Sequence, residues 1–293
     1  MPRAGASCAV GRPRALEPAP AGGENRPVPR SRPDPAPVRR FLLAGDPEQG
    51  APTLAPGELR HALRVMRLAP GDRLCGLDGR GASWPLEVTA VGRDRLELVR
   101  CGPPVREAEP GAGGAGGEWI ELALSLPRGA RTAAMVERLV QLGLARLRPV
   151  VSERSAPHAR EAGAHRRERL ERTVGEAMKQ SGRVWPTLIE TAAPLAEATP
   201  FPAGVRAVLL DGGAGAAPLG EVLCAGRATG PWTRAAPLVL WVGPEGGYSD
   251  SERAVLTASG ALAGNLGPAT LRTETAAEAA LAVAVQAALA DSP

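Results

Sequence analysis

The spacing of hydrophobic and polar positions changes along the chain and predicts two structured regions. From Val38 to about Arg100 the apolar residues form short runs between polar turns, which is typical of a small β-rich domain. The strands predicted in this region are 39–44, 72–79, 83–91 and 94–100. One helix is predicted over 57–68, where the apolar residues have helical spacing.

Beyond Gly117 the apolar runs alternate with segments of helical period. The predicted strands are 118–126, 145–152, 184–190, 205–211, 238–242 and 261–267. The predicted helices are 130–144, 160–182, 250–259 and an alanine-rich helix that follows Thr275. This alternation favours the α/β class, with a largely parallel sheet that carries helices on both faces.

Composition marks the boundaries between these regions. Residues 1–37 are rich in proline, arginine and small residues and lack an apolar period. We expect them to be a disordered segment or an extension assigned from too early a start codon. Residues 102–117 are dominated by proline and glycine, which predicts a linker. The expected domains are therefore 38–101 and 118–293.

Charge and cysteine content narrow the class of protein. The formal net charge of the 293 residues is +4, and Lys179 is the single lysine, so the basic residues are almost all arginines. This modest excess is compatible with a polyanionic partner. The four cysteines are scattered, without a CxxC pair, so neither a zinc site nor a disulfide framework is predicted. No apolar run reaches membrane-spanning length, and we expect a cytoplasmic protein without a membrane partner.

The stretch "LVLWVGPEGGYSDSE", Leu238 to Glu252, predicts a ligand loop. An apolar strand stops at Gly243, and Ser249 followed three residues later by Glu252 is a capping box that starts a helix. The glycines between them sit at the carboxyl end of a strand, which is where open α/β sheets bind ligands. The loop has neither the GxGxxG nor the GK[ST] pattern, so a standard phosphate loop is not indicated.

Two further loops have the same character. "LGPATLRTETAAEAA", 266–280, follows a short apolar strand, and Thr275 with Glu278 predicts a second capping box. Asp211 and the glycines after it end another apolar strand. Each loop alone is more often a simple turn than a site, but three of them at strand ends favour one shared site.

These loops carry a resemblance to a known family. "LPRGAR", "SERS", "EAMKQSGR", "VGPEGGYSDSE" and "LGPATLRTETAAEAA" resemble, in order, motifs of the RsmE family, the 16S rRNA (uracil-N3)-methyltransferases of the SPOUT superfamily. "RHALRVMRLAPGDRLCGLDG" extends the resemblance into the first domain. The chain departs from the family at Gln141, where a glutamate is usual, at Trp185 and at Tyr248.

The resemblance implies a fold and a cofactor. The second domain is expected to be a SPOUT domain with a C-terminal trefoil knot, and the first a PUA-like β-barrel that binds RNA. The knot loops are expected to bind S-adenosyl-L-methionine near the interface of a homodimer. The implied cofactor residues are Leu210, Asp211, Gly212, Val242, Gly243, Pro244, Glu245, Gly246, Gly247, Leu266, Gly267, Leu271, Arg272, Thr273, Glu274, Thr275 and Ala276.

The implied chemistry needs an arginine and a proton acceptor. Methylation of uracil N3 requires loss of the N3 proton and leaves charge on the ring oxygens. Arg272 is the first candidate for stabilising that charge, because its guanidinium can donate two hydrogen bonds. Glu245 and Glu274 are the candidates for the base. Each also has a structural alternative, because Glu245 can fix its turn and Glu274 can complement a helix amino terminus.

RNA contacts are predicted from arginine placement and from the family motifs. Arg60, Arg64 and Arg67 have helical spacing and predict one basic stripe, for which a solvated helix face is the alternative. The remaining candidates are His61, Arg128, Arg154, Gln180, Ser181 and Arg183. The implied partner is 16S rRNA in the small ribosomal subunit, at uridine 1498. Another RNA target, or a non-catalytic ribosome-assembly protein, remains as an alternative.

Overall fold

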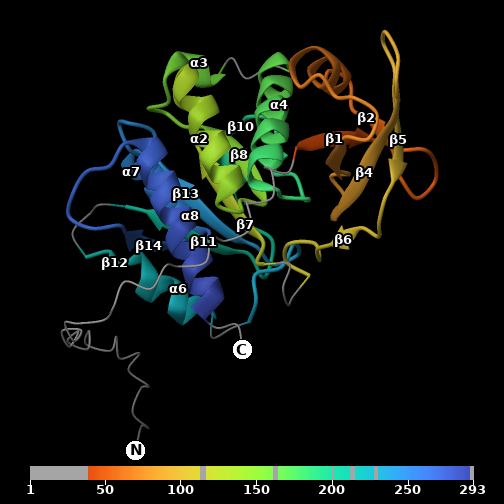
Figure 1. The fold of residues 1–293 in the computed structure, drawn as a ribbon. Coiled ribbons are helices and arrows are strands. Elements are labelled where there is room, and N and C mark those ends of the chain that lie inside the picture. Colours follow the sequence, from red (N-terminus) through yellow and green to blue (C-terminus); the bar gives the residue numbers. More distant parts are fainter. Residues whose placement is uncertain are drawn as a thin grey trace, which may run out of the picture. The chain divides into compact units, whose positions relative to one another are not determined.

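The computed structural model describes residues 39–112, 117–160, 164–199, 201–211, 215–227 and 230–290. The predictions made for residues 1–37 and for Gly212 therefore lie outside the described residues. Val38–Pro293 forms one compact unit, and both sheets of the fold belong to it (Figure 1).

The first sheet is a nearly closed barrel. Its strands are β1 (Arg40–Ala44), β2 (Thr53–Leu54), β3 (Arg73–Leu77), β4 (Ala82–Val91), β5 (Leu96–Arg100) and β6 (Val105–Arg106). They follow the order β2-β1-β3-β4-β5, with β6 paired to β4, and the outermost strands β2 and β5 contact each other. Alternate residues of β4, including Trp84, Leu86 and Val88, point into the barrel core, as the period of two predicts.

The barrel extends into the segment predicted to be a linker. Strand β6 pairs with the start of β4, with Arg106 opposite Ala82. The next residue continues the contact, because the backbone N–H of Glu107 donates to the carbonyl of Gly81 at 2.8 Å. Residues 102–107 are thus part of the barrel edge.

The helix of the first domain is shorter than its apolar period suggested. Helix α1 (Glu58–Arg60) continues as a π-helical turn, η1 (His61–Val65), and the chain then leaves the helix, with Arg67 at φ 50°. The prediction that Arg60, Arg64 and Arg67 form one stripe is therefore wrong. The physical reason is a tertiary contact: the helix buries Glu58, whose carboxylate accepts from Lys179 Nζ at 2.7 Å, and this contact sets which face points inward.

The second sheet is parallel throughout, as predicted. Its strands are β7 (Ile120–Leu124), β8 (Arg146–Val151), β9 (Leu188–Ile189), β10 (Ala193–Pro194), β11 (Arg206–Leu210), β12 (Ala217–Pro218), β13 (Leu238–Val242) and β14 (Leu262–Asn265). The order is β10-β8-β7-β13-β11-β14-β12, with β9 on β8. Strand β13 is central and buried along its whole length, which explains its uninterrupted apolar run.

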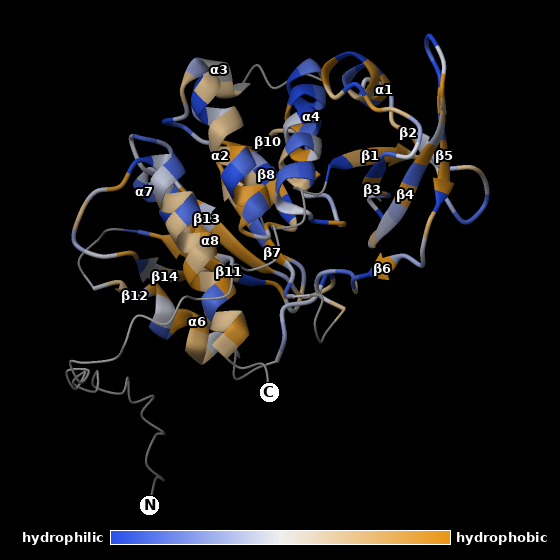
Figure 2. Ribbon diagram, viewed as in Figure 1, coloured by the Kyte–Doolittle hydropathy of each residue, from blue (hydrophilic) through white to orange (hydrophobic). Residues whose placement is uncertain are grey.

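Helices cover both faces of this sheet. They are α2 (Ala130–Gln141), α3 (Pro157–Arg160), α4 (Ala164–Ser181), α5 (Leu195–Ala198), α6 (Leu219–Arg227), α7 (Asp250–Ala258) and α8 (Thr273–Ala290). Residues of α2, α4, α6 and α8 share one core cluster with the sheet, and residues of α5 and α7 share the cluster on the opposite face. Figure 2 shows the hydrophobic colouring of the central strands β11 and β13 and the mixed colouring of helices α2 and α4.

Two element boundaries differ from the predictions. Helix α8 starts at Thr273, and its first intrahelical bond joins Ala276 N–H to the carbonyl of Arg272, so the predicted capping box of Thr275 and Glu278 is wrong. The strand predicted over 184–190 is confined to β9. Val184 and Trp185 bond to the barrel instead. The carbonyl of Val184 accepts from Gly81 N–H at 3.3 Å, and Trp185 Nε1 donates to the carbonyl of Glu107 at 3.1 Å.

Candidate functional site

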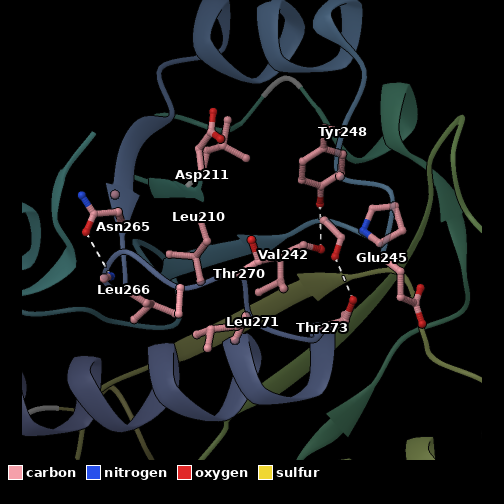
Figure 3. Close-up of a pocket in the computed structure, with 18 of the residues that line it drawn as sticks. Leu210, Asp211, Val242, Glu245, Tyr248, Asn265, Leu266, Thr270, Leu271 and Thr273 are labelled. Atoms are coloured by element: carbon pink, nitrogen blue, oxygen red, sulfur yellow. Dashed lines mark hydrogen bonds between the residues drawn. The ribbon is translucent and has the colours of Figure 1, made fainter. Parts of the chain in front are cut away.

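The structure has a pocket at the carboxyl ends of β11, β13 and β14 (Figure 3). Because these strands are parallel neighbours, the loops that follow them meet at one edge of the sheet. The lining comes from 209–211, from most of 242–248, from 264–271 and from the first turns of α8. Two of the three loops singled out in the sequence, together with Asp211 at the start of the third, therefore line one cavity.

Most of the predicted cofactor residues line this pocket. They are Leu210, Asp211, Val242, Gly243, Pro244, Glu245, Gly247, Leu266, Gly267, Leu271, Thr273 and Ala276. Gly246, Arg272, Glu274 and Thr275 belong to the same loops and do not line it. Gly212 lies outside the described residues.

The pocket also contains residues that were not predicted. They are Leu209, Tyr248, Arg253, Gly264, Asn265, Pro268, Ala269 and Thr270. Pro268, Ala269 and Thr270 stand within the quoted "LGPATL" motif, so the whole motif was the available signal. Arg253 had no signal in the sequence, because it reaches the pocket from α7 by pairing with Asp211.

The loop after β13 folds back on itself as a tight turn. Gly247 N–H donates to the carbonyl of Pro244 at 2.8 Å, and Gly247 has φ 67°. A Cβ on Gly243 would lie 3.3 Å from Cα of Gly247. Glycine is needed at both ends of the turn, at 243 for close approach and at 247 for the left-handed backbone.

Two side-chain hydroxyls anchor the end of β13. Tyr248 donates from its hydroxyl to the carbonyl of Val242 at 3.1 Å, and Thr273 donates from Oγ1 to the carbonyl of Gly243 at 3.1 Å. Both bonds are drawn in Figure 3. Burial of the Tyr248 phenol raises its pKa, with a smaller contribution from the charge of Glu252. This tyrosine is therefore a neutral hydrogen-bond donor that closes the turn.

The "SERS" segment supports the same loop from behind. Arg154 donates from Nη1 to the carbonyls of Gly246 at 2.9 Å and Tyr248 at 3.4 Å. Glu153 N–H donates to the carboxylate of Glu252 at 2.7 Å, and the other oxygen of Glu252 completes the predicted capping box with Ser249. The first capping-box prediction is thus confirmed, and Arg154 holds the loop.

Charged side chains border the pocket. Asp211 is ion-paired with Arg253, and Glu245 lies 3.6 Å from Nη2 of Arg131. The three catalytic candidates differ in position. Glu245 lines the pocket, Glu274 is nearly buried beside Arg131, and Arg272 is exposed between two pocket residues.

The RNA-contact candidates separate into two groups. Arg60, His61, Arg64, Arg67, Arg128 and Gln180 are exposed. Ser181 is exposed as well, and its Oγ donates to the carbonyl of Ala177 at 2.7 Å. Arg183 donates to the carbonyls of Val140 at 2.7 Å and Leu144 at 3.2 Å, and burial lowers its pKa. This guanidinium binds the end of α2, so a structural role stands beside the predicted RNA contact of Arg183.

No group of described residues is arranged to hold a metal ion, and no described helix is long and apolar enough to cross a membrane. The site is instead a pocket lined by glycine-containing loops and by both apolar and polar side chains. Two family models match this chain: residues 117–285 match an RNA methyltransferase domain, and residues 54–99 match an RNA methyltransferase PUA domain. The fold and the site thus define the class of two-domain RNA methyltransferases.

Similarity to individual proteins narrows the class. The Ribosomal RNA small subunit methyltransferase E of Synechocystis sp. is 30% identical over 84% of this chain and 77% of its own length. The protein of that name from Mycobacterium bovis is 32% identical over 82% of this chain and 88% of its own. The chain belongs to the ribosomal RNA small subunit methyltransferase E family, which confirms the resemblance read from the motifs.

Solved structures of related proteins have a similar fold. A probable rRNA-methyltransferase from Porphyromonas gingivalis matches 86% of this chain and 99% of its own, with a TM-score of 0.70 and 26% identity. The Ribosomal RNA small subunit methyltransferase E from Neisseria gonorrhoeae, a structure with bound S-adenosyl methionine, matches 84% of this chain and 95% of its own, with a TM-score of 0.68 and 26% identity.

Proposed function

We propose that this protein transfers a methyl group from S-adenosyl-L-methionine to N3 of uridine 1498 in 16S rRNA. The observation that carries the proposal is the pocket that two glycine-containing loops form at the ends of adjacent strands, together with Asp211 at the end of a third strand. Membership of the family supports rRNA as the substrate, and the Neisseria gonorrhoeae structure supports the cofactor. We place the reaction in the cytoplasm, on the assembled small ribosomal subunit.

The pocket residues fit this cofactor. Leu210, Val242, Leu266 and Leu271 offer an apolar surface for an adenine ring, and the glycine loops allow close approach of the backbone. The carboxylates of Asp211 and Glu245 suit the positive charge of a sulfonium group. When bound, S-adenosylmethionine supplies an electrophilic methyl group.

The protein must orient the uracil ring and accept its N3 proton. Glu245 is the better placed of the two base candidates, because it is one of the residues that line the pocket and Glu274 is not. Arg272 stands between Leu271 and Thr273, and its side chain is exposed. It forms no ion pair with another described residue. We propose that Arg272 donates to the ring oxygens, where charge develops as the proton leaves.

RNA binding is proposed for the barrel and for the exposed arginine after β7. Arg60, His61 and Arg64 are exposed on α1 and η1, and Arg128 is exposed after β7. Such arginines contact phosphates without selecting a sequence. We therefore propose that they hold the RNA, while the pocket selects the base.

We further propose that the protein is a homodimer and that its C-terminal part forms the trefoil knot implied by the resemblance. The cofactor-loop motifs that carry the resemblance support both proposals. Light scattering coupled to size-exclusion chromatography tests the dimer. A monomer at micromolar concentration would contradict it.

The function is tested by methyl transfer to a natural substrate. The wild-type protein is incubated with labelled S-adenosylmethionine and small subunits from a strain that lacks the modification, and the methylated nucleoside is mapped by mass spectrometry. We expect label on N3 of uridine 1498. Absence of label contradicts the enzyme, and label at another nucleotide or atom contradicts the target.

A pair of glycine variants connects the activity to the pocket. In Gly243→Ala the new Cβ presses against the backbone of Gly247 and Tyr248 at 3.3–3.4 Å, so the turn must shift by a few tenths of an ångström. Gly220→Ala, in α6, meets no atom within 4 Å and lies outside the pocket. We expect cofactor binding and methyl transfer to fall in Gly243→Ala only.

A further inference from the structure

One guanidinium links the two carboxylates that are candidates for the proton acceptor. Arg131 Nη2 lies 3.6 Å from Glu245 Oε1, and Arg131 Nη1 lies 3.5 Å from Glu274 Oε1. Glu245 belongs to the loop after β13, and Glu274 belongs to the first turn of α8. Arg131 thus connects two pocket-forming segments that are distant in the sequence.

The position of Arg131 is fixed by the start of α2. Gly129 precedes the helix with φ 62°, and Thr132 N–H donates to the carbonyl of Gly129 at 3.2 Å. The buried hydroxyl of Thr132 donates to the carbonyl of Pro127. These contacts make the first turn a rigid support for the arginine side chain.

The two carboxylates depend on this arginine to different extents. Glu245 has a side chain 51% exposed, so water can solvate it. Glu274 has a side chain only 12% exposed, and its Oε2 is buried without a hydrogen-bond partner. A charged group in that position needs a nearby opposite charge, because burial removes its hydration.

We propose that Arg131 is a positioning residue for methyl transfer. Its guanidinium holds Glu274 with one nitrogen and Glu245 with the other, and so fixes where the Glu245 carboxylate stands at the edge of the pocket. A planar guanidinium can span two carboxylates, whereas an ammonium group is a point charge. The proposal rests on the proposed function, because it concerns the geometry of that reaction.

Placement is the main expected contribution. The side chain of Arg131 is 46% exposed, so its ion pair with the half-exposed Glu245 adds little to folding. Misplacement of a reacting group by about 1 Å can lower a rate by about 100-fold. We therefore expect the loss of Arg131 to lower the rate of the chemical step. It also removes the counter-charge of the buried Glu274, so Arg131→Ala should be less stable than wild type, and Arg131→Lys, which keeps the charge, separates the two effects.

Arg138 supplies a matched control. It lies on the same helix as Arg131 and is similarly exposed, and its Nη2 pairs with Glu278 of α8 at 2.7 Å. It therefore joins the same two helices, but Glu278 does not line the pocket. If Arg131 only attached α2 to α8, the two alanine variants would behave alike.

The experiment measures single-turnover methyl transfer at saturating cofactor and small subunits, together with thermal stability, for wild type, Arg131→Ala, Arg131→Lys and Arg138→Ala. We expect Arg131→Ala to be slower by about 10- to 100-fold. Extra cofactor should not restore its rate. Arg131→Lys should fall between Arg131→Ala and wild type, and Arg138→Ala should match wild type.

Each outcome has a separate meaning. A wild-type protein that transfers no methyl group contradicts the proposed function and not the inference about geometry. If the wild type is active, equal rates for Arg131→Ala and Arg138→Ala overturn the role of Arg131. A wild-type rate in Arg131→Lys overturns the bridging of two carboxylates. If Arg131→Ala is both slow and thermally unstable, the rate of Arg131→Lys decides whether the role of Arg131 stands.

Discussion

Thr273 Oγ1 donates a hydrogen bond to the backbone carbonyl of Gly243 across 3.1 Å. The bond joins the first residue of α8 to the loop that follows β13, so two walls of the pocket are fixed to each other. It also explains why the helix begins at Thr273, two residues before the predicted cap.

Removal of this hydroxyl should weaken cofactor binding. Thr273→Val keeps the shape of the buried side chain and loses a bond worth about 1 kcal/mol. If this bond stabilises the loops in the conformation that binds the cofactor, its loss raises the dissociation constant for S-adenosylmethionine about fivefold. Isothermal titration calorimetry measures it. Thr257→Val, at an exposed position of α7, is the control, and equal affinities for the two variants would contradict the prediction.

Replacing Arg154 should weaken cofactor binding more than RNA binding. Its Nη1 is occupied by the carbonyls of Gly246 and Tyr248, so Arg154→Ala releases the loop from the "SERS" segment. We expect weaker cofactor binding and an unchanged salt dependence of RNA affinity. A residue that contacts a phosphate would instead reduce that salt slope by about one when replaced. Arg128→Ala, at an exposed position, is expected to show this second pattern.

Arg183 should contribute to folding. Its guanidinium binds two carbonyls at the end of α2, and hydrogen bonds from charged groups are worth about 1.5–3 kcal/mol. Chemical denaturation of Arg183→Ala should therefore show a loss of about 2 kcal/mol. Arg172→Ala, on the exposed face of α4, should remain as stable as wild type. Wild-type stability together with reduced RNA affinity in Arg183→Ala would contradict the structural role and support the RNA contact.

The sequence predicted the features that depend on neighbouring residues. Strand β13 is an uninterrupted apolar run, and Ser249 with Glu252 marks the start of α7, so both elements were found at the correct place. The convergence of the loops followed from strand order in a parallel sheet, and the pocket residues came from motifs.

The errors arose where distant contacts decide the local structure. The helix of the barrel buries Glu58, whose carboxylate accepts a hydrogen bond from Lys179, 121 residues further along the chain. The segment 184–187 bonds to the barrel edge through Val184 and Trp185 and does not extend β9. Arg131 stands in the quoted "LPRGAR" motif, but its pairing with Glu245 and Glu274 joins segments that are distant along the chain. The motif marked the residue and could not show its two partners.

The buried phenol of Tyr248 predicts a loss of stability at alkaline pH. Burial raises its pKa in the folded protein, while an unfolded tyrosine ionises near pH 10. Below pH 10 both states keep the proton, so the stabilising effect is fully present. Above pH 10 the unfolded state loses the proton and the folded state keeps it. The free energy of unfolding should then fall by about 1.4 kcal/mol per pH unit from this group.

Tyr248→Phe isolates this contribution. The variant loses the hydroxyl bond to the carbonyl of Val242, so at pH 8 it should be less stable than wild type by about 1 kcal/mol. Above pH 10 that difference should shrink, because only the wild type has a phenol to ionise on unfolding. Urea denaturation of both proteins between pH 8 and 11 measures it. Tyr248 is the only tyrosine in the chain, so tyrosinate absorbance reports its ionisation directly, and ionisation of the folded wild type near pH 10 would contradict the buried, neutral phenol.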